Sequence, residues 1–578
     1  MRKYVLTAAV VLGTPATAQA DVFDSAFGRI GFAPAPLAAA GDRFNATVTD
    51  AAGNVYAAGY LVPDAAVANQ VMAVAKLTPA GRLDANFGVG GVAVVDADPT
   101  NNTVEQARGI ALQSDGKVVI GGVAGPAADD TDVVVARFTA GGVIDNGFGG
   151  AGTGFRKISL STGGDQAWGL ANRGEDKLVI VAARGRDGAR VDRDFSFLGL
   201  TKDGTDDPAW TTTTTRLQVA GTDLNENPRG VTVAPDGKVL IGSYASAGAV
   251  TRPFIFRLLA DGKPDPSWGE SGVASFDLNG AAPNTSESYA LGVQSDGKVV
   301  SVGYGNTGTP ANVNLLVTRL NPDGTKDTSF ATDGVYSYDG GRADRARNVV
   351  IAPDDKILVV GNTEVAASNA DALLIKLSED GAQESVTRAD LGGTTDALFG
   401  ATLTPDKQSA IAVGWQGTTA ANEDAAALKL NFVAPPAPVE VEKLVEKVVT
   451  NTVTVTVPAT VNKPAAPLAR SSAKRTYTSG PRRLSGTVSS PTNVSKVLVR
   501  LTKGTGSACR AYQPARGAFS GRSCSSGKGF AVAYEGGKWS LDLAKKLGKG
   551  TYALEVSAYG LDGLAQSTAT KARITVKR

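Results

Sequence analysis

The feature that most constrains this chain is a repeat of about 60 residues that fills its first two thirds. An aromatic residue, usually followed by glycine, recurs at steps of 60, 61, 62, 58 and 62 residues. The copies are Phe27-Gly28, Phe87-Gly88, Phe148-Gly149 and Trp268-Gly269, with Trp210 and Phe330 in register but without the glycine. A fixed period of this length indicates a repeat architecture, in which one unit cannot bury its apolar face alone.

A second mark of the repeat is Asp-Gly-Lys followed by an apolar run. It appears as SDGKVVIGG at 114–122, PDGKVLIGS at 235–243 and SDGKVVSVG at 295–303, with degenerate copies at 50–59, 175–183, 354–361 and 406–414. Asp-Gly between two apolar runs predicts a β-hairpin, and we expect a type I′ turn with positive φ at both central residues. The chain therefore holds seven copies of the unit.

The third mark is an apolar strand that carries one basic residue and ends the unit. The basic residues are Lys76, Arg137, Arg257, Arg319, Lys376 and Lys429, and FSFLGL at 195–200 holds the same place without a base. Because each base alternates with apolar neighbours, we expect these side chains at the exposed outer edges of the sheets, where they would discourage edge-to-edge pairing.

Together the marks describe four short strands per unit. One follows the aromatic-Gly turn, the second resembles ARGIAL at 107–112, the third follows Asp-Gly-Lys and the fourth carries the base. Seven such units predict an all-β chain with a seven-bladed β-propeller over residues 21–433, in which each aromatic residue wedges between adjacent blades. A β-solenoid is the alternative architecture.

The aromatic-Gly turn, the SDGKVVIGG hairpin and the VVVARF strand at 133–138 resemble the delta-60 repeats of secreted bacterial proteins. The resemblance covers about residues 22–432 and is most specific in copies two, four, five and six. It implies a β-propeller-like fold and brings no catalytic residues that can be carried over.

The last quarter of the chain has a different composition. Residues 434–479 are rich in Pro, Val and Thr, which predicts a linker or stalk. Its Val/Thr alternation favours extended structure or an edge strand over a stable helix. Period-two segments with Gly turns over 480–578 predict a small β-sandwich. Residues 536–563 resemble the end of bacterial immunoglobulin-like modules, which implies that Trp539, Tyr552 and Tyr559 lie in or beside its core.

The N-terminus predicts export. Arg2 and Lys3 precede a mostly apolar stretch and the small residues Ala18-Gln19-Ala20, the pattern of a secretory signal peptide over residues 1–20 with cleavage before Asp21. No later stretch offers 18 uninterrupted apolar residues, so no transmembrane segment is expected. We expect a secreted or cell-surface-associated protein.

The two cysteines and the absence of histidine limit the kinds of catalytic and metal site that this chain can form. Cys509 and Cys524 lie in one polar segment, and in an oxidising compartment we expect them to form a disulfide worth about 3 kcal/mol, with free thiols as the alternative. A chain with no histidine and two cysteines has no His-based acid/base site, Ser-His-Asp triad or four-cysteine zinc site.

No cofactor is expected, with calcium bound in Asp-rich turns as the alternative. The Asp-rich turns at 203–207 and 323–327 offer oxygen atoms that calcium favours, but they lack the ligand spacing and the closing Glu of an EF-hand loop. Asp and Gly are also common in turns without any metal.

Charge divides the chain into two parts. Residues 463–578 hold 21 Lys and Arg against 4 Asp and Glu, whereas the whole chain has a net charge of only +2. We therefore expect the basic C-terminal module to favour an anionic cell-wall polymer, a polysaccharide or a surface protein. No motif that reads nucleic acid is present.

Two functional hypotheses are compatible with the sequence. The first is an exported, non-enzymatic binding or scaffold protein at the bacterial cell envelope, with no catalytic residues. The alternative is a carboxylate-based propeller enzyme acting on polysaccharide, which needs two acids about 5 to 9 Å apart in one pocket. The two hypotheses differ in whether the central channel of the propeller gathers acidic residues beside an aromatic platform.

Overall fold

The computed structural model describes residues 40–432 except 65–68, 100–103, 128, 187–191, 212, 216–217, 220–221, 224, 248–249, 277–284, 307–311 and 418–422. It also describes residues 23–24, 27–28, 32–35 and 37, and in the C-terminal part 452–457, 474–477, 483–488, 494–503, 509–513, 518–520, 530–535, 538–560 and 570–577. All regular elements of this described part are strands, and none of it forms a helix able to cross a membrane. The chain divides into two compact units, Met1–Ala437 and Pro438–Arg578.

In the described part of the first unit, the strands form seven four-stranded antiparallel sheets and one two-stranded ribbon. Six sheets follow chain order: β2 (Ala40–Thr49), β3 (Val55–Val62), β4 (Val71–Leu77) and β5 (Val92–Val95); β6 (Val104–Leu112), β7 (Val118–Ala127), β8 (Asp130–Phe138) and β9 (Phe155–Ile158); β10 (Gln166–Asn172), β11 (Leu178–Arg184), β12 (Asp194–Leu200) and β13 (Thr213–Thr215); β16 (Asn225–Val233), β17 (Val239–Ala247), β18 (Val250–Leu258) and β19 (Val273–Ser275); β20 (Ser286–Val293), β21 (Val299–Asn306), β22 (Val313–Leu320) and β23 (Val335–Tyr338); β24 (Asp344–Ile351), β25 (Ile357–Ala366), β26 (Asn369–Leu377) and β27 (Gln383–Ala389). The ribbon pairs β14 (Gln218–Val219) with β15 (Thr222–Asp223).

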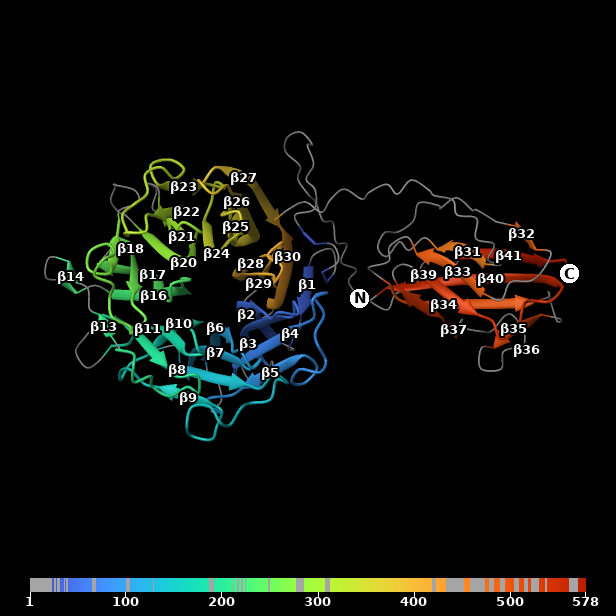
Figure 1. Cartoon of the computed structure of the whole chain (residues 1–578), viewed down its shortest axis with the longest axis horizontal. Coiled ribbons are helices and arrows are strands. Elements are labelled where there is room, and N and C mark those ends of the chain that lie inside the picture. The colour runs from blue at the N-terminus through green and yellow to red at the C-terminus, as the bar shows by residue number, and fades with distance from the viewer. Residues whose placement is uncertain are drawn as a thin grey trace. The chain divides into compact units, whose positions relative to one another are not determined.

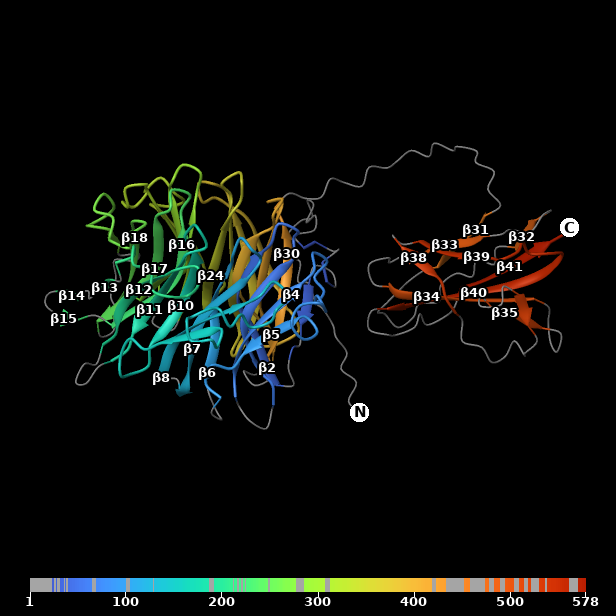
Figure 2. The same cartoon turned by 60° about the horizontal axis from the view of Figure 1, so that its bottom comes forward.

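The seventh sheet combines the two ends of this unit. Strands β28 (Ala397–Leu403), β29 (Ser409–Gly417) and β30 (Glu423–Asn431) are completed by β1 (Phe32–Ala35), which pairs with β30 from the N-terminal segment. Figure 1 shows the sheets arranged around a common centre, and Figure 2 shows their long strands standing side by side around it. Separate antiparallel sheets are the propeller-like arrangement, and they differ from the continuous ladder of a solenoid.

Each sheet begins one strand later in the chain than the predicted repeat unit, which starts at the aromatic turn. The strand after each aromatic turn pairs with the basic strand before it, as β9 does with β8, so the turn lies inside a sheet and not at its start. The hairpin at Asp-Gly-Lys is present, but its predicted turn type is wrong. Gly116, Gly237 and Gly297 have positive φ, whereas the preceding Asp residues do not. The Asp115 carboxylate instead accepts a hydrogen bond from the Lys117 N–H, at 3.1 Å, so only the glycine needs the left-handed conformation.

Each aromatic residue of the repeat turn packs against the neighbouring sheet. The six side chains are at most 6% exposed, and each lies on a glycine in the next sheet's turn: a Cβ added to Gly204 would come within 2.5 Å of the Phe148 ring. The backbone joins the same two sheets, because the Gly149 N–H donates to the Asp203 carbonyl at 2.9 Å. The equivalent bonds are Gly28 to Ala80, Gly88 to Gly141, Thr211 to Asp261, Gly269 to Asp323 and Ala331 to Asp380.

None of the six basic residues is exposed, so their predicted place at an exposed outer edge is wrong. Arg137, Arg257 and Arg319 lie under this contact, whereas Lys376 donates to the Asn431 carbonyl at 2.6 Å. The Arg319 side chain is 2% exposed, and its Nε donates to Asp327 at 2.7 Å. Its guanidinium lies 4.8 Å from the Phe330 ring and reaches Asp380 of the next sheet at 3.1 Å. The Asp three residues before the aromatic is the common partner: Lys76 pairs with Asp84, Arg137 with Asp145, Arg257 with Asp265 and Lys429 with Asp24. Arg137 and Arg319 can be buried because each is paired with an aspartate and stacked on a ring.

In the unit without a base on its fourth strand, the cation that pairs with the aspartate comes from a different segment of the chain. Gly199 occupies the position of the base, and the Trp210 indole fills the space, since a Cβ on Gly199 would lie 2.1 Å from its ring. Arg173, from the turn after β10, forms the ion pair with Asp207 and lies 4.7 Å from the Trp210 ring. The Asp, the guanidinium and the aromatic ring are therefore retained together.

The described strands of the second unit form two sheets. One is β31 (Thr452–Val457), β33 (Arg483–Val488), β39 (Lys538–Asp542) and β38 (Ala533–Glu535). The other is β32 (Lys474–Tyr477), β41 (Thr570–Val576), β40 (Gly550–Gly560), β34 (Val494–Lys503), β35 (Arg510–Gln513) and β36 (Ala518–Ser520), with β37 (Phe530–Ala531) paired to β34. Leu484 and Trp539 of the first sheet share a buried core with Val499 and Tyr552 of the second. Strands β31 and β32 come from residues 434–479, and β31 is the edge of its sheet, as the Val/Thr alternation predicts.

Several sequence predictions fall outside the described residues. They are the signal peptide over 1–20, most of 434–479, Cys524 and the side chain of Tyr559. Cys509 is described and is 5% exposed. Its pairing with Cys524 stays a prediction.

Candidate functional site

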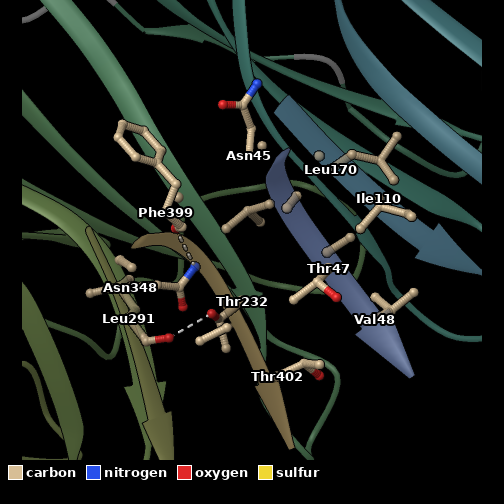
Figure 3. A pocket seen from close by; sticks show the side chains of 18 of the residues that line it. Asn45, Thr47, Val48, Ile110, Leu170, Thr232, Leu291, Asn348, Phe399 and Thr402 are labelled. Carbon is tan, nitrogen blue, oxygen red and sulfur yellow. Dashed lines mark hydrogen bonds between the residues drawn. The ribbon is translucent and has the colours of Figure 1, made fainter. Parts of the chain in front are cut away.

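A central cavity of about 960 Å³ is lined by the first strand of all seven sheets of the first unit, β2, β6, β10, β16, β20, β24 and β28. Each of these strands is the end strand of its sheet, so one edge of its backbone has no strand partner. Among the described residues, side chains bond to the carbonyl of a neighbouring edge at five places. Asn45 donates to Ala107, Thr49 to Leu403, Arg108 to Ala167, Thr232 to Leu291 and Asn348 to Phe399, always to the backbone carbonyl. Figure 3 shows the last two of these bonds.

Every cavity-lining strand has a β-bulge at the same place. The register of each first strand against its second strand skips one residue, for example between Ala107 and Gly109 in β6. A bulge leaves the extra residue out of the ladder and turns its side chain away from the pleat. The skipped residues, which we call the bulge layer, are Asn45, Arg108, Trp168, Arg229, Tyr289, Arg347 and Phe399, and all seven line the cavity.

The bulge layer alternates guanidinium groups with aromatic rings. Arg108 and Arg229 each lie 4.1 Å from the Trp168 ring centre. Arg229 is 5.1 Å from Tyr289, and Arg347 lies between Tyr289 at 4.7 Å and Phe399 at 4.9 Å. Each contact is a cation–π pair, which is worth most where water is excluded. The layer is therefore a stacked arc of six side chains, and Asn45 is its one small member.

The positive charge of the layer is only partly neutralised. Arg229 lies 3.4 Å from Glu287. Arg108 donates to the neutral Gln166 and Gln106 side chains at 3.0 and 3.2 Å. Burial lowers the pKa of Arg108 to about 10, and repulsion from Arg229 and Arg193 acts in the same direction. The group stays protonated at neutral pH, so the layer is cationic.

Carboxylates do not face this cavity: none of the described residues that line it is Asp or Glu. Two acids that contact lining arginines are paired, since Glu423 forms an ion pair with Arg43 and Glu287 lies beside Arg229. The arrangement expected of the carboxylate enzyme, two free acids in one pocket, is not present among these lining residues.

A set of buried acids instead holds the loops that lead into the cavity-lining strands. Glu105 is fully buried and accepts hydrogen bonds from the Ala97 and Asp98 N–H groups at 3.1 and 2.6 Å. Asp396 accepts one from the Leu391 N–H at 2.6 Å. Burial raises the pKa of Glu105 to about 7 and that of Asp396 to about 6, against the lowering effect of these backbone bonds.

The residues that the sequence predicts as sites lie outside the cavity lining. Phe27, Phe87, Phe148, Trp210, Trp268 and Phe330 lie between sheets and outside the cavity lining. In the Asp-rich turns, Asp203 pairs with Arg137 and Asp206 with Arg156. Over the described residues, no group of three or more Asp, Glu or Cys is placed to hold a metal ion.

Sequence reasoning missed the bulge layer, although a signal for it exists. In six units a large arginine or aromatic residue stands next to at least one small residue, as in Ala107-Arg108-Gly109 and Ala167-Trp168-Gly169, whereas the first unit has Asn45 at this place. The small neighbours are needed because adjacent first strands approach closely there: a Cβ on Gly109 would lie 2.5 Å from the Leu170 nitrogen.

Comparison with known families identifies the repeat. Residues 113–148, 234–267, 294–330 and 352–385 match the family described as "Domain of unknown function (DUF5122) beta-propeller". These are copies two, four, five and six, the four in which the sequence marks are most specific. The chain is a propeller-repeat protein.

Solved structures show similarity only at a low level. A protein of unknown function from Dyadobacter fermentans has 11% identity and a TM-score of 0.37, covering 56% of this chain and 94% of that chain. Drosophila Semaphorin 2a has 7% identity and a TM-score of 0.43, covering 94% and 97%. The polysaccharide lyase Uly1 has 11% identity and a TM-score of 0.42, covering 68% and 90%. These values carry no argument about function. Comparison with curated proteins finds no match.

The buried acids predict that stability falls as pH rises from about 5 to 8. A carboxyl with a raised pKa is protonated in the folded state and ionised in the unfolded state within this window, so its contribution is present at low pH and lost as pH passes the folded pKa. For Glu105 the effect is on the order of 3 kcal/mol. Because the chain has no histidine, no imidazole titrates between pH 5 and 8 and adds its own pH dependence to the stability.

Glu105→Gln should flatten this pH dependence, as measured by urea unfolding at several pH values, whereas Glu270→Gln at an exposed site should leave it unchanged. An unfolding free energy of the unmodified chain that rises between pH 5 and 8 would contradict the assignment.

Proposed function

We propose that this protein is an exported, non-enzymatic binding protein of the bacterial cell envelope. In this proposal the first unit is a closed seven-bladed propeller of delta-60 repeats that binds a ligand, and the second unit is an immunoglobulin-like module that attaches to an anionic surface. The observation that carries the binding function is the cavity itself, which has a cationic, aromatic layer and no described lining carboxylate. Such a cavity can hold a ligand but offers no acid/base pair.

Closure of the propeller is supported by the pairing of β1 with β30. Phe32 pairs with Leu428, and the Asp24 carboxylate bonds to Lys429 at 2.8 Å, the same partnership that the other units make within one stretch of chain. An N-terminal strand that completes the last sheet ties the two ends of the ring together, which leaves no sheet without two neighbours.

The attachment role is supported by charge. The 21 basic and 4 acidic residues of 463–578 give this part of the chain a strong positive field, which attracts anionic polymers and is screened by salt. The preceding residues carry the compensating negative charge, so the propeller itself is not drawn to the same surface.

Salt-dependent sedimentation with cell envelopes tests this attachment. The mature chain should sediment with purified envelopes at low ionic strength and be released at high ionic strength, whereas a chain ending at Ala437 should remain in the supernatant at both. Retention that salt leaves unchanged, or equal retention of the shortened chain, would count against the proposal.

Export and the disulfide are tested together by mass spectrometry of the secreted, unreduced protein. The first residue should be Asp21, and the peptides containing Cys509 and Cys524 should be joined. An intact N-terminus or two free thiols would remove the corresponding part of the proposal.

A further inference from the structure

We propose that the bulge layer is an oxyanion site and that its ligand is an acidic saccharide, whose carboxylate or sulfate group pairs with the Arg108 and Arg347 guanidinium groups. This inference rests on the proposed binding function and names the ligand class of the propeller cavity.

The first argument is an imbalance of charge. Four arginines line the cavity, Arg43, Arg108, Arg229 and Arg347, and the described lining residues include no carboxylate. Arg43 and Arg229 have carboxylate partners outside the lining. Arg108 and Arg347 have no ion pair among the described residues. Both side chains are half-buried. A cation that is partly removed from water without a counter-charge is costly, and an anionic ligand would lower that cost.

The second argument is the geometry of the guanidinium groups. Arg347 has Tyr289 and Phe399 within 5 Å, so its faces are occupied by rings and its N–H groups bond only in its own plane. The Nε atoms of Arg229 and Arg347 are buried and have no hydrogen-bond partner among the described residues. A guanidinium offers Nε and Nη together as a fork, which matches two oxygens of a carboxylate or sulfate.

The third argument is access. Asn45 is the small member of the layer, and the cavity also contacts Arg43 and Gln106, which precede the layer by two residues on β2 and β6. The cavity therefore passes the layer beside Asn45. Figure 3 shows Asn45 and Phe399 together at one end of the cavity, with Val48 and Thr402 towards the other.

The fourth argument separates a saccharide from an acyl chain. The cavity walls are the free edges of seven strands, whose N–H and C=O groups need polar partners. Side chains bond to the carbonyl of an adjacent wall at only five places among the described residues. A hydrocarbon chain would bury these groups unpaired, at a cost of several kcal/mol in total. Sugar hydroxyls both donate and accept, so they suit such walls.

Calorimetry with defined oligomers tests the proposal on the mature chain. A uronate pentamer should bind, a neutral glucose pentamer of the same length should not, and inorganic sulfate should compete with the uronate. Arg347→Gln should weaken uronate binding about tenfold, since it removes one charged fork. Arg82→Gln, which makes the same charge change at an exposed position, should leave the affinity unchanged.

A second variant guards against a loss that comes only from misfolding. Glu287→Gln removes the carboxylate beside Arg229 and should tighten uronate binding, which a damaged fold would not do. Equal binding of the neutral pentamer, equal affinity of Arg347→Gln and Arg82→Gln, or equal binding of a glutamate pentapeptide would overturn the saccharide site. Envelope retention through the C-terminal unit does not depend on this cavity, so that result can stand when the site fails.

Discussion

The contact between an aromatic side chain of one sheet and a glycine of the next is the interaction on which the first unit depends. A four-stranded sheet of this size has two apolar faces and cannot bury either alone, so its stability comes from its neighbours. Phe148 covers Gly204, and Arg137 beneath it bonds both to Asp145 of its own sheet and to Asp203 of the next. One cluster therefore supplies apolar burial, a charge pair and a backbone bond between the same two sheets.

The same arrangement creates the cavity. Sheets that pack face to face around a centre leave their first strands with one unpaired edge each, and the space between these edges needs polar contents. The bulges in these strands put large side chains into that space, and six of the seven, from Arg108 to Phe399, form the alternating stack. Arginine is tolerated there because aromatic rings cover its faces, so its N–H groups bond only in the plane of the guanidinium.

The sequence predicts the repeat, the antiparallel strands and the buried aromatics because those depend on local spacing. It fails at Arg319, whose alternation with apolar neighbours suggests an exposed edge, because the pairing with Asp327 and the stacking on Phe330 are set by packing between sheets. The Asp three residues before each aromatic was visible in the sequence and would have revealed the pair. The bulge layer is harder to predict, because Trp168 and Arg229 become neighbours only when sheets about 60 residues apart are placed side by side.

Hydrogen exchange after removal of one inter-sheet aromatic side chain tests most directly whether the sheets depend on one another. In Phe148→Ala, amide protection should fall both in β6–β9, which carry the residue, and in β10–β13, whose Gly204 turn it covers, whereas Val89→Ala at a 90% exposed site should change neither. Loss of protection confined to β6–β9 would mean that each sheet is stable by itself, which contradicts the account.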